Sequence, residues 1–275
     1  MKKLFISTIF AFAAFSAFAY DSSVFTPNGK FSSYTQTSYS VTSKFGNYFR
    51  AVSAKDVYVF DDTGLKLETS TYNAKDELLG KLQFKYDTSR NLSSETFVDA
   101  NGNVLWTTKI EYETDGKLKS DSEYDANNKL ISRIIYKYED SKITEDYYDG
   151  DGALLTRKIQ TVNENNKPLE IVQYFGDGSL NMRQVYNYLS SGKISSVEEY
   201  DGFNNIREKT LYKYDANEVL AEVQVYNGAN VLIQRNSYRT DSRGNPTRIS
   251  VYKVAQKFGT TVNELQSITE YVYKQ

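Results

Sequence analysis

Tyrosine and the carboxylates dominate the chemistry that this chain can offer. The 275 residues include 24 Tyr and 35 Asp plus Glu, but no Cys and no His. Ser-His-Asp and Cys-His nucleophilic sites and His-rich zinc sites are therefore excluded. A carboxylate pair roughly 5–10 Å apart would suit glycoside hydrolysis, but so many acids follow the predicted strands that no pair is selected. We predict a protein that is not an enzyme and needs no cofactor.

The sequence DGDGALL, residues 149–155, is the best candidate for a metal site. A hand-type calcium loop needs oxygen ligands at positions 1, 3, 5 and 12 and a glycine at position 6. Counted from Asp149, position 5 is Ala153 and position 12 is Gln160, so the pattern fails. A glycine-rich hairpin turn explains these residues, and we predict no metal site. Weak calcium binding between stacked Asp turns is the alternative.

Tyrosine is the residue type with the most potential for binding. Its ring stacks on flat ligands such as sugars, and its hydroxyl adds a hydrogen bond at low entropic cost. In any sheet, however, the same rings also pack across strands. The predicted ligand-binding residues are Tyr112, Tyr136, Tyr138, Tyr188, Tyr212 and Tyr214.

The tyrosines recur with a period of 26 residues, as in Tyr86, Tyr112 and Tyr138, and again in Tyr188 and Tyr214. A second aromatic series runs half a period out of step. Each half-period is an alternating stretch that ends in an aromatic residue, followed by Asp, Asn or Gly and then an aliphatic residue. This pattern predicts β-hairpins. A two-residue deletion is predicted between Tyr138 and Tyr148.

The predicted fold is all-β, an antiparallel meander of about eight 26-residue, two-strand repeats. Because about sixteen strands cannot lie flat, we expect a coiled, solenoid-like or single-layer sheet. Residues 20–54 are expected to cap the N-terminus, residues 55–254 to form the array, and residues 255–275 to form a C-terminal cap with a short helical turn and a closing strand. An outer-membrane barrel is disfavoured, because runs such as KSDSEYD place charge on both faces.

Residues 1–19 are predicted to be an export signal. Lys2 and Lys3 precede an apolar run, and Ala17-Phe18-Ala19 supplies the small residues for cleavage after Ala19. The mature protein would be periplasmic or secreted and would have no membrane span. Its 31 basic and 35 acidic residues give a net charge of −4, which argues against nucleic acid and anionic membranes as partners.

Two resemblances to known families accompany these patterns. The corner in LYKYDANEVL resembles the YD repeat of Rhs-type shell proteins and the MORN-like hairpin repeats, which implies a coiling antiparallel sheet and transfers no activity. The segment VAQKFGTTVNELQSI, residues 254–268, resembles the second half of a LysM module, which implies peptidoglycan binding. Its opening loop is not recognisable here, so we expect a structural cap.

Together these features predict a binding or scaffolding module in the bacterial cell envelope or outside the cell. Protein partners would add a strand to an open sheet edge or occupy a Tyr-rich groove. The alternative is a peptidoglycan or polysaccharide binder that uses the Tyr-rich face and the LysM-like tail. A glycan hydrolase is the third hypothesis, without nominated residues.

Overall fold

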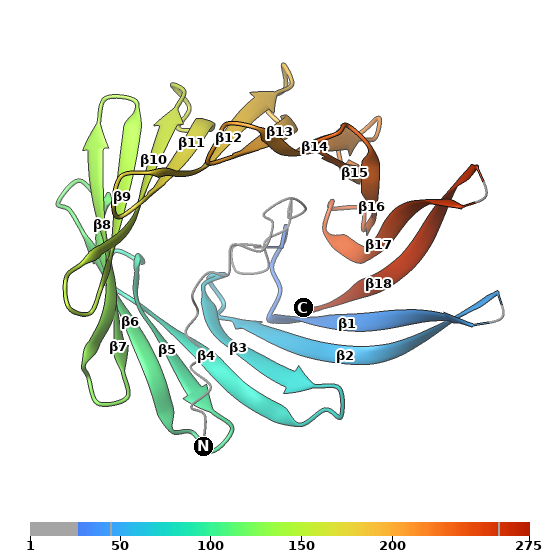
Figure 1. Cartoon of the computed structure of the whole chain (residues 1–275). Helices are drawn as coiled ribbons and strands as arrows, with labels where there is room; N and C mark the ends of the chain where they lie inside the picture. The colour runs from blue at the N-terminus through green and yellow to red at the C-terminus, as the bar shows by residue number, and fades with distance from the viewer. Residues whose placement is uncertain (1–26, 45, 258) are drawn as a thin grey trace, which may run out of the picture.

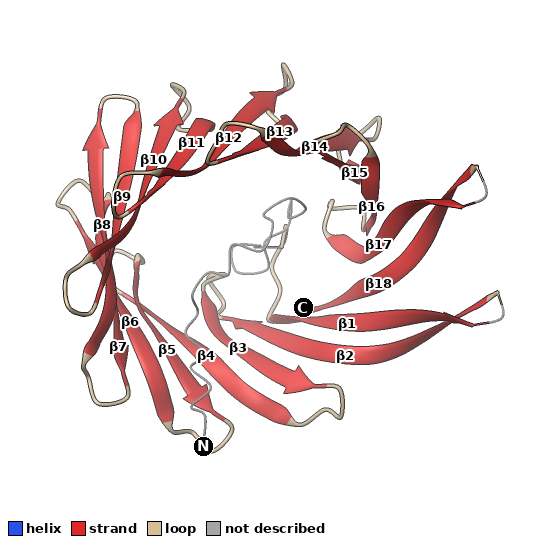
Figure 2. Cartoon of the chain, viewed as in Figure 1, coloured by secondary structure: helices blue, strands red, loops and turns tan. Residues whose placement is uncertain are grey.

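The chain folds into one antiparallel sheet of eighteen strands that closes on itself (Figures 1 and 2). The computed structural model describes residues 27–44, 46–257 and 259–275. The strands are β1 Ser33–Lys44, β2 Asn47–Phe60, β3 Lys66–Asn73, β4 Leu78–Tyr86, β5 Leu92–Asp99, β6 Val104–Tyr112, β7 Leu118–Asp125, β8 Leu130–Glu139, β9 Lys142–Asp149, β10 Leu154–Val162, β11 Pro168–Phe175, β12 Leu180–Tyr188, β13 Ile194–Asp201, β14 Ile206–Tyr214, β15 Leu220–Asn227, β16 Leu232–Thr240, β17 Pro246–Lys257 and β18 Thr260–Lys274.

The ring closes where the first strand pairs with the last. Each strand pairs with the next along the chain, and β1 also pairs with β18 from Ser33↔Lys274 to Ser40↔Ser267. The expected solenoid-like or single-layer sheet is therefore wrong, because both ends of the array satisfy their backbone groups by pairing with each other. Repetition of the hairpin is confirmed, with eighteen strands rather than about sixteen.

Aromatic packing reinforces the pairing at the closure. Tyr34 of β1 is fully buried, and its ring stacks on Tyr58 of β2 with centroids 4.3 Å apart. Tyr271 and Tyr273 of β18 lie within 6.4 and 5.7 Å of the same ring. Phe60 completes this cluster, which holds the largest buried aromatic group among the described residues. The closure thus combines backbone pairing with a cluster of buried aromatic side chains.

The hairpin turns share one local structure. At Asp99, the Gly102 N–H donates to the main-chain carbonyl of Asp99, and the Asp99 N–H donates to Asn103. The Asp99 carboxylate accepts from the N–H groups of Asn101 and Asn103, both at 2.9 Å. Gly102 has φ of 85°, the left-handed backbone that the corner requires. Asp and Asn recur at this position because a short side-chain oxygen replaces missing backbone partners.

The predicted two-residue deletion is confirmed by the turn between β8 and β9. Only Asp140 and Ser141 separate these strands, and Glu139 pairs directly with Lys142. The loss of two residues is absorbed in the turn, so the strand register continues around the ring.

The two ends of the chain differ from their expected structure. Residues 33–44 and 47–60, partly in the expected N-terminal cap, form two strands of the ring. The segment 255–266, expected to make helical turns, lies in the hairpin of β17 and β18. Residues 254–257 pair in register with residues 260–263, from Val254↔Asn263 to Lys257↔Thr260. The predicted export signal lies outside the described residues.

Within the described ranges, no helix is long and apolar enough to cross a membrane.

The stabilising role of the turn carboxylate can be tested by substitution at Asp99. Asp99→Ala should lower the Tm, because two turn N–H groups lose their acceptor. Asp99→Asn should retain the wild-type Tm, since Asn73, Asn163 and Asn227 use an amide oxygen in the same way. Thermal unfolding monitored by circular dichroism checks both variants. Equal Tm values for Ala and Asn would refute this role of the side chain.

Candidate functional site

The strand register assigns each side chain to one of two faces. Side chains alternate along a strand, and cross-strand partners share a face. Followed from β2 to β6, one face carries Tyr58, Thr69, Leu82, Phe97 and Trp106. We call this face the inner wall and the opposite face the outer surface.

Electrostatics distinguish the two faces. On the inner wall, burial is the largest cause of a raised pKa for Glu95 and Asp121. On the outer surface, hydrogen-bonded Arg157 and Lys209 lower the pKa values of Asp146 and Glu198. In a closed barrel, inward side chains converge and lose solvent, whereas outward side chains diverge. The same face carries Tyr34 and Val223, which are completely buried, and it is therefore the inner one.

The inner wall is rich in tyrosine, and one series of rings marks the corners at one end of the barrel, here called the corner end. Each corner hydroxyl donates to a backbone carbonyl twenty or more residues upstream, so it fastens neighbouring hairpins. These bonds are Tyr86 to Lys66 at 2.8 Å, Tyr112 to Leu92 at 3.0 Å, Tyr188 to Pro168 at 2.5 Å, Tyr214 to Ile194 at 2.8 Å and Tyr273 to Pro246 at 2.8 Å.

Away from the corners, the inner wall places tyrosines beside carboxyl groups. The Tyr136 hydroxyl donates to Asp121 Oδ2 at 2.7 Å, while Asp121 Oδ1 is buried without a hydrogen-bond partner. Burial raises the pKa of Tyr136, and the neighbouring Asp121 and Glu145 raise it further. Burial raises the pKa of Tyr186 to about 12. These phenols remain protonated donors at any physiological pH.

Glu199 and Glu208 form a like-charge pair on this wall. They are direct cross-strand partners between β13 and β14. Burial, and then the charge of Glu199, raise the pKa of Glu208 to about 7. Gln184 Nε2 donates to Glu199 at 3.1 Å, and Arg207 approaches it at 3.5 Å. Glu208 is therefore a half-buried acid whose raised pKa lies near neutral pH.

Carboxylates outnumber bases on the inner wall. Among the described residues, Asp56, Glu95, Asp121, Glu123 and Glu208 all have raised pKa values and no ion pair. Glu145 is different, because Lys158 pairs with it at 2.6 Å. The charges of Lys66 and Arg207 act on Glu95 and Glu208 only from a distance. A cationic ligand would thus meet carboxyl groups that make no ion pair with the protein.

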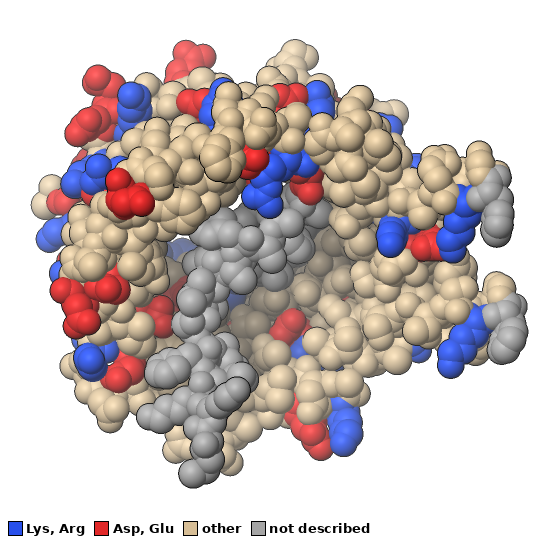
Figure 3. All heavy atoms as spheres, in the orientation of Figure 1, with Lys and Arg blue, Asp and Glu red and all other residues tan. Residues whose placement is uncertain are grey.

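On the outer surface, ion pairs join side chains of adjacent strands. Figure 3 shows Lys and Arg beside Asp and Glu around the ring. Asp146 is fully buried there between Arg157 at 2.5 Å and Lys137 at 3.1 Å. Lys209 contacts Glu198 at 2.8 Å in the same way. Tyrosines of the half-period series lie among these charges, and Lys55 Nζ stands 4.3 Å above the Tyr72 ring. The strand surface facing outward is therefore polar along its middle.

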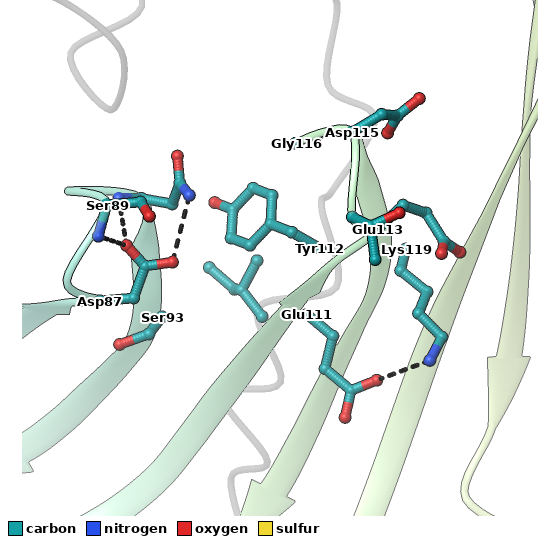
Figure 4. A pocket seen from close by; sticks show the side chains of 12 residues that line it. Asp87, Ser89, Ser93, Glu111, Tyr112, Glu113, Asp115, Gly116 and Lys119 are labelled. Carbon is teal, nitrogen blue, oxygen red and sulfur yellow. Dashed lines mark hydrogen bonds and ion pairs between the residues drawn. The ribbon is translucent and has the colours of Figure 1, made fainter.

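A hollow of about 750 Å³ opens at the corner end between two neighbouring turns (Figure 4). Tyr112 lies between the turn of Asp87 and the turn of Asp115. The carboxylate of Asp87 is engaged with its own turn through Ser89 and Asn91, and Asp115 pairs with Lys117. These polar groups are already satisfied, so the hollow is a corner between repeats with little left to bind a ligand.

All six predicted ligand-binding tyrosines lie on the inner wall, but in two different roles. Tyr112, Tyr188 and Tyr214 are corner residues whose hydroxyls are committed to backbone carbonyls. Tyr136 and Tyr212 lie further along the strands, and burial raises the pKa of both. The sixth, Tyr138, is a corner residue of β8. Ligand binding by any of them stays a prediction.

The inner-wall carboxyl groups were not nominated from the sequence. Alternation places Asp121 and Glu208 on the tyrosine face, and that signal was available. Their loss of solvent follows from closure of the ring, which the repeat does not reveal. Within the described chain, no cluster of three or more metal-binding side chains occurs.

No family model matches the chain, and no curated protein matches it. Among solved structures, the chain is similar to a porin-like protein from Bacteroides uniformis, with 11% identity, a TM-score of 0.49, and coverage of 90% of this chain and 99% of that one. It is also similar to a protein of unknown function from Bacteroides fragilis, with 16% identity, a TM-score of 0.22, and coverage of 63% and 94%.

A third similarity is to the Photorhabdus luminescens Tc holotoxin pore, with 13% identity, a TM-score of 0.19 and coverage of 76% of this chain. The chain spans only 16% of that protein's length. Of the resemblance to YD-repeat and MORN-like families, only the repeated hairpin is supported, by the order of the strands. The LysM-like segment is a β-hairpin rather than the helical turns expected for it.

The pKa of Glu208 makes stability depend on pH. Because the folded-state value of about 7 exceeds the ordinary 4.5, the folded protein holds this proton more tightly than the unfolded chain. Stability should therefore fall as pH rises from about 4.5 to about 7. Glu208→Gln should raise the Tm at pH 8 and reduce the fall between pH 5 and pH 8.

The matched control is Glu164→Gln, which removes an exposed turn carboxylate. It should leave the pH profile of the Tm unchanged. An identical profile for Glu208→Gln and the wild type would contradict the raised pKa of Glu208.

Proposed function

We propose that the protein is an exported, non-catalytic binding module of the cell envelope or the extracellular space. Its inner wall would take a cationic, aromatic-rich segment of a partner protein. The observation that carries this proposal is the presence on one wall of half-buried tyrosines and of carboxyl groups that make no ion pair, among them Glu95 and Asp121.

Closure of the ring favours an interior site over strand addition along the array. Within the ring every strand pairs on both sides, so the array offers no open edge there. Rings of sixteen to eighteen strands enclose an interior wide enough for more than side chains. The space-filling surface is hollowed at the centre of the ring (Figure 3).

The chemistry of the inner wall selects the class of partner. Lys and Arg side chains would supply the charge that the inner carboxylates lack, and their cations also interact with tyrosine faces. The wall already shows this contact, because Lys66 Nζ lies 5.6 Å from the Tyr58 ring and 5.1 Å from the Phe84 ring. An anionic ligand would meet repulsion, and a neutral glycan would leave the carboxylates unpaired.

The experiment uses Trp106, which is the single tryptophan of the chain, as the reporter. Trp106 lies on the inner wall, stacked on Phe97 with centroids 5.7 Å apart. Titration at pH 8 with a peptide of alternating Lys and Tyr should change its fluorescence saturably. A peptide of alternating Glu and Tyr and a soluble peptidoglycan fragment should produce no change.

The variant Glu95→Gln/Asp121→Asn should weaken binding of the Lys-Tyr peptide by roughly tenfold or more, as expected when charge-assisted contacts are lost. Its control, Glu113→Gln/Glu164→Gln, makes the same change in net charge at exposed turns and should bind normally. Equal weakening in both variants would reduce the effect to overall charge. A response to the glycan alone would overturn the proposal in favour of a polysaccharide binder.

A further inference from the structure

Exposed apolar side chains concentrate at one end of the barrel. Of the seventeen large apolar side chains that are exposed among the described residues, thirteen lie at the end opposite the corner tyrosines. We call it the fork end, because two hairpins project from it. Second residues of alternate strands recur in this set: Leu79, Leu105, Ile131, Leu155 and Ile233. Scattered apolar exposure is ordinary, but a one-sided distribution marks an interaction surface.

Two hairpins extend beyond the ring at this end (Figure 1). The strands β1, β2, β17 and β18 have 12, 14, 12 and 15 residues, whereas the other strands have 8 to 10. Pairing of β1 with β18 stops at Ser40↔Ser267, while β1 and β2 remain paired to Lys44↔Asn47. Four residues at about 3.4 Å each carry this hairpin about 14 Å past its last neighbour.

The second hairpin is free in the same way. Pairing of β16 with β17 stops at Lys253, but β17 and β18 stay paired to Lys257↔Thr260. Both turns contain the sequence Lys-Phe-Gly, at residues 44–46 and 257–259. The two projecting hairpins thus share a tip sequence as well as a position, although they lie more than two hundred residues apart.

The first hairpin carries an exposed aromatic ring on each of its faces. Tyr48 and Phe49 are neighbours and point to opposite faces, yet they are 55% and 56% exposed. Val52 is 37% exposed. A protein partner that packs on one face of a hairpin would leave the other aromatic ring in water. A medium that surrounds the hairpin would cover both.

We propose that the fork end docks on a phospholipid bilayer, with the tip of the β1–β2 hairpin placed in the interfacial region. Aromatic side chains favour that region, where ring and polar tip are both accommodated. The ring of aliphatic side chains around the same end would rest on the surface behind the hairpins. This docking surface is separate from the inner wall, so it stands or falls independently of the proposed ligand.

Charge at the fork end favours apolar over electrostatic attachment. Residues 41–53 contain Lys44 and Arg50 and no acid, but Arg50 is paired with Glu270 of β18 at 2.7 Å. Lys44 is therefore the cation of this segment that suits a lipid phosphate. The turns of the rim carry Asp99 and Asp201, whose pKa values their own turns lower, so they stay ionised. The opposing charges predict binding to neutral lipid that changes little with salt. The negative net charge of the whole chain agrees with a contact confined to the tips.

The test is co-sedimentation of the mature protein with phosphatidylcholine vesicles, at about 0.1 M and about 1 M NaCl. Wild-type protein should sediment with the vesicles at both salt concentrations. Tyr48→Ser/Phe49→Ser should weaken the partition by roughly tenfold, because two rings lose their apolar environment. The matched control, Leu67→Ser/Leu169→Ser, removes two exposed apolar side chains from the corner end and should partition normally.

Three results would overturn the proposal. Wild-type protein could remain in the supernatant, or both double variants could lose binding equally. The protein could also form dimers without vesicles that dissociate on Tyr48→Ser/Phe49→Ser, measured by sedimentation velocity, which would assign the surface to a second copy of the chain. The Tm of each variant is measured first. A Tm equal to that of the wild type shows that a loss of sedimentation reflects lost docking and not unfolding.

Discussion

The pairing of β1 with β18 is the interaction on which the rest of the structure depends. Eight residue pairs, Ser33↔Lys274 to Ser40↔Ser267, join segments from the two ends of the sequence. Their formation costs the closure entropy of nearly the whole chain, so they need compensating burial. The cluster of Tyr34, Tyr58 and Tyr271 supplies it, and backbone groups that would otherwise form exposed edges become satisfied.

Closure also creates the difference between the two faces. The repeat places one tyrosine series and acids without ion pairs on one side of each strand. It places ion-paired charges and the second tyrosine series on the other side, and closure of the ring turns the first side inward. Glu208 then loses solvent and gains a high pKa, while Asp146 keeps a low pKa because Arg157 and Lys137 accompany it on the outer surface. The proposed cationic ligand follows from this contrast. At the fork end, the pairing of β1 with β18 ends before the pairing of β1 with β2 does, so that hairpin projects from the ring.

The local structure could be predicted from the sequence because it depends on neighbouring residues. The 26-residue period located the hairpins, and the deletion located the short turn at Asp140 and Ser141. Closure could not be predicted, because nothing in the sequences of residues 33–40 and 267–274 indicates that these two segments pair. The expectation of helical turns near residue 255 was wrong. The resemblance to a LysM module favoured a helix there, whereas the segment is extended and pairs with β18. The six tyrosines share the predicted face, but their division into corners and wall needs the third dimension.

The most direct test of the closed ring is a cross-link between its ends. Thr35 and Val272 are partners across β1 and β18, and the chain has no native cysteine, so Thr35→Cys/Val272→Cys provides one defined pair. The control pair is Thr107→Cys/Tyr124→Cys between β6 and β7, which lie side by side whether or not the ring closes. After treatment with a short thiol cross-linker, mass spectrometry should find both links with similar yield. A control link without the terminal link would show an open array and contradict the account.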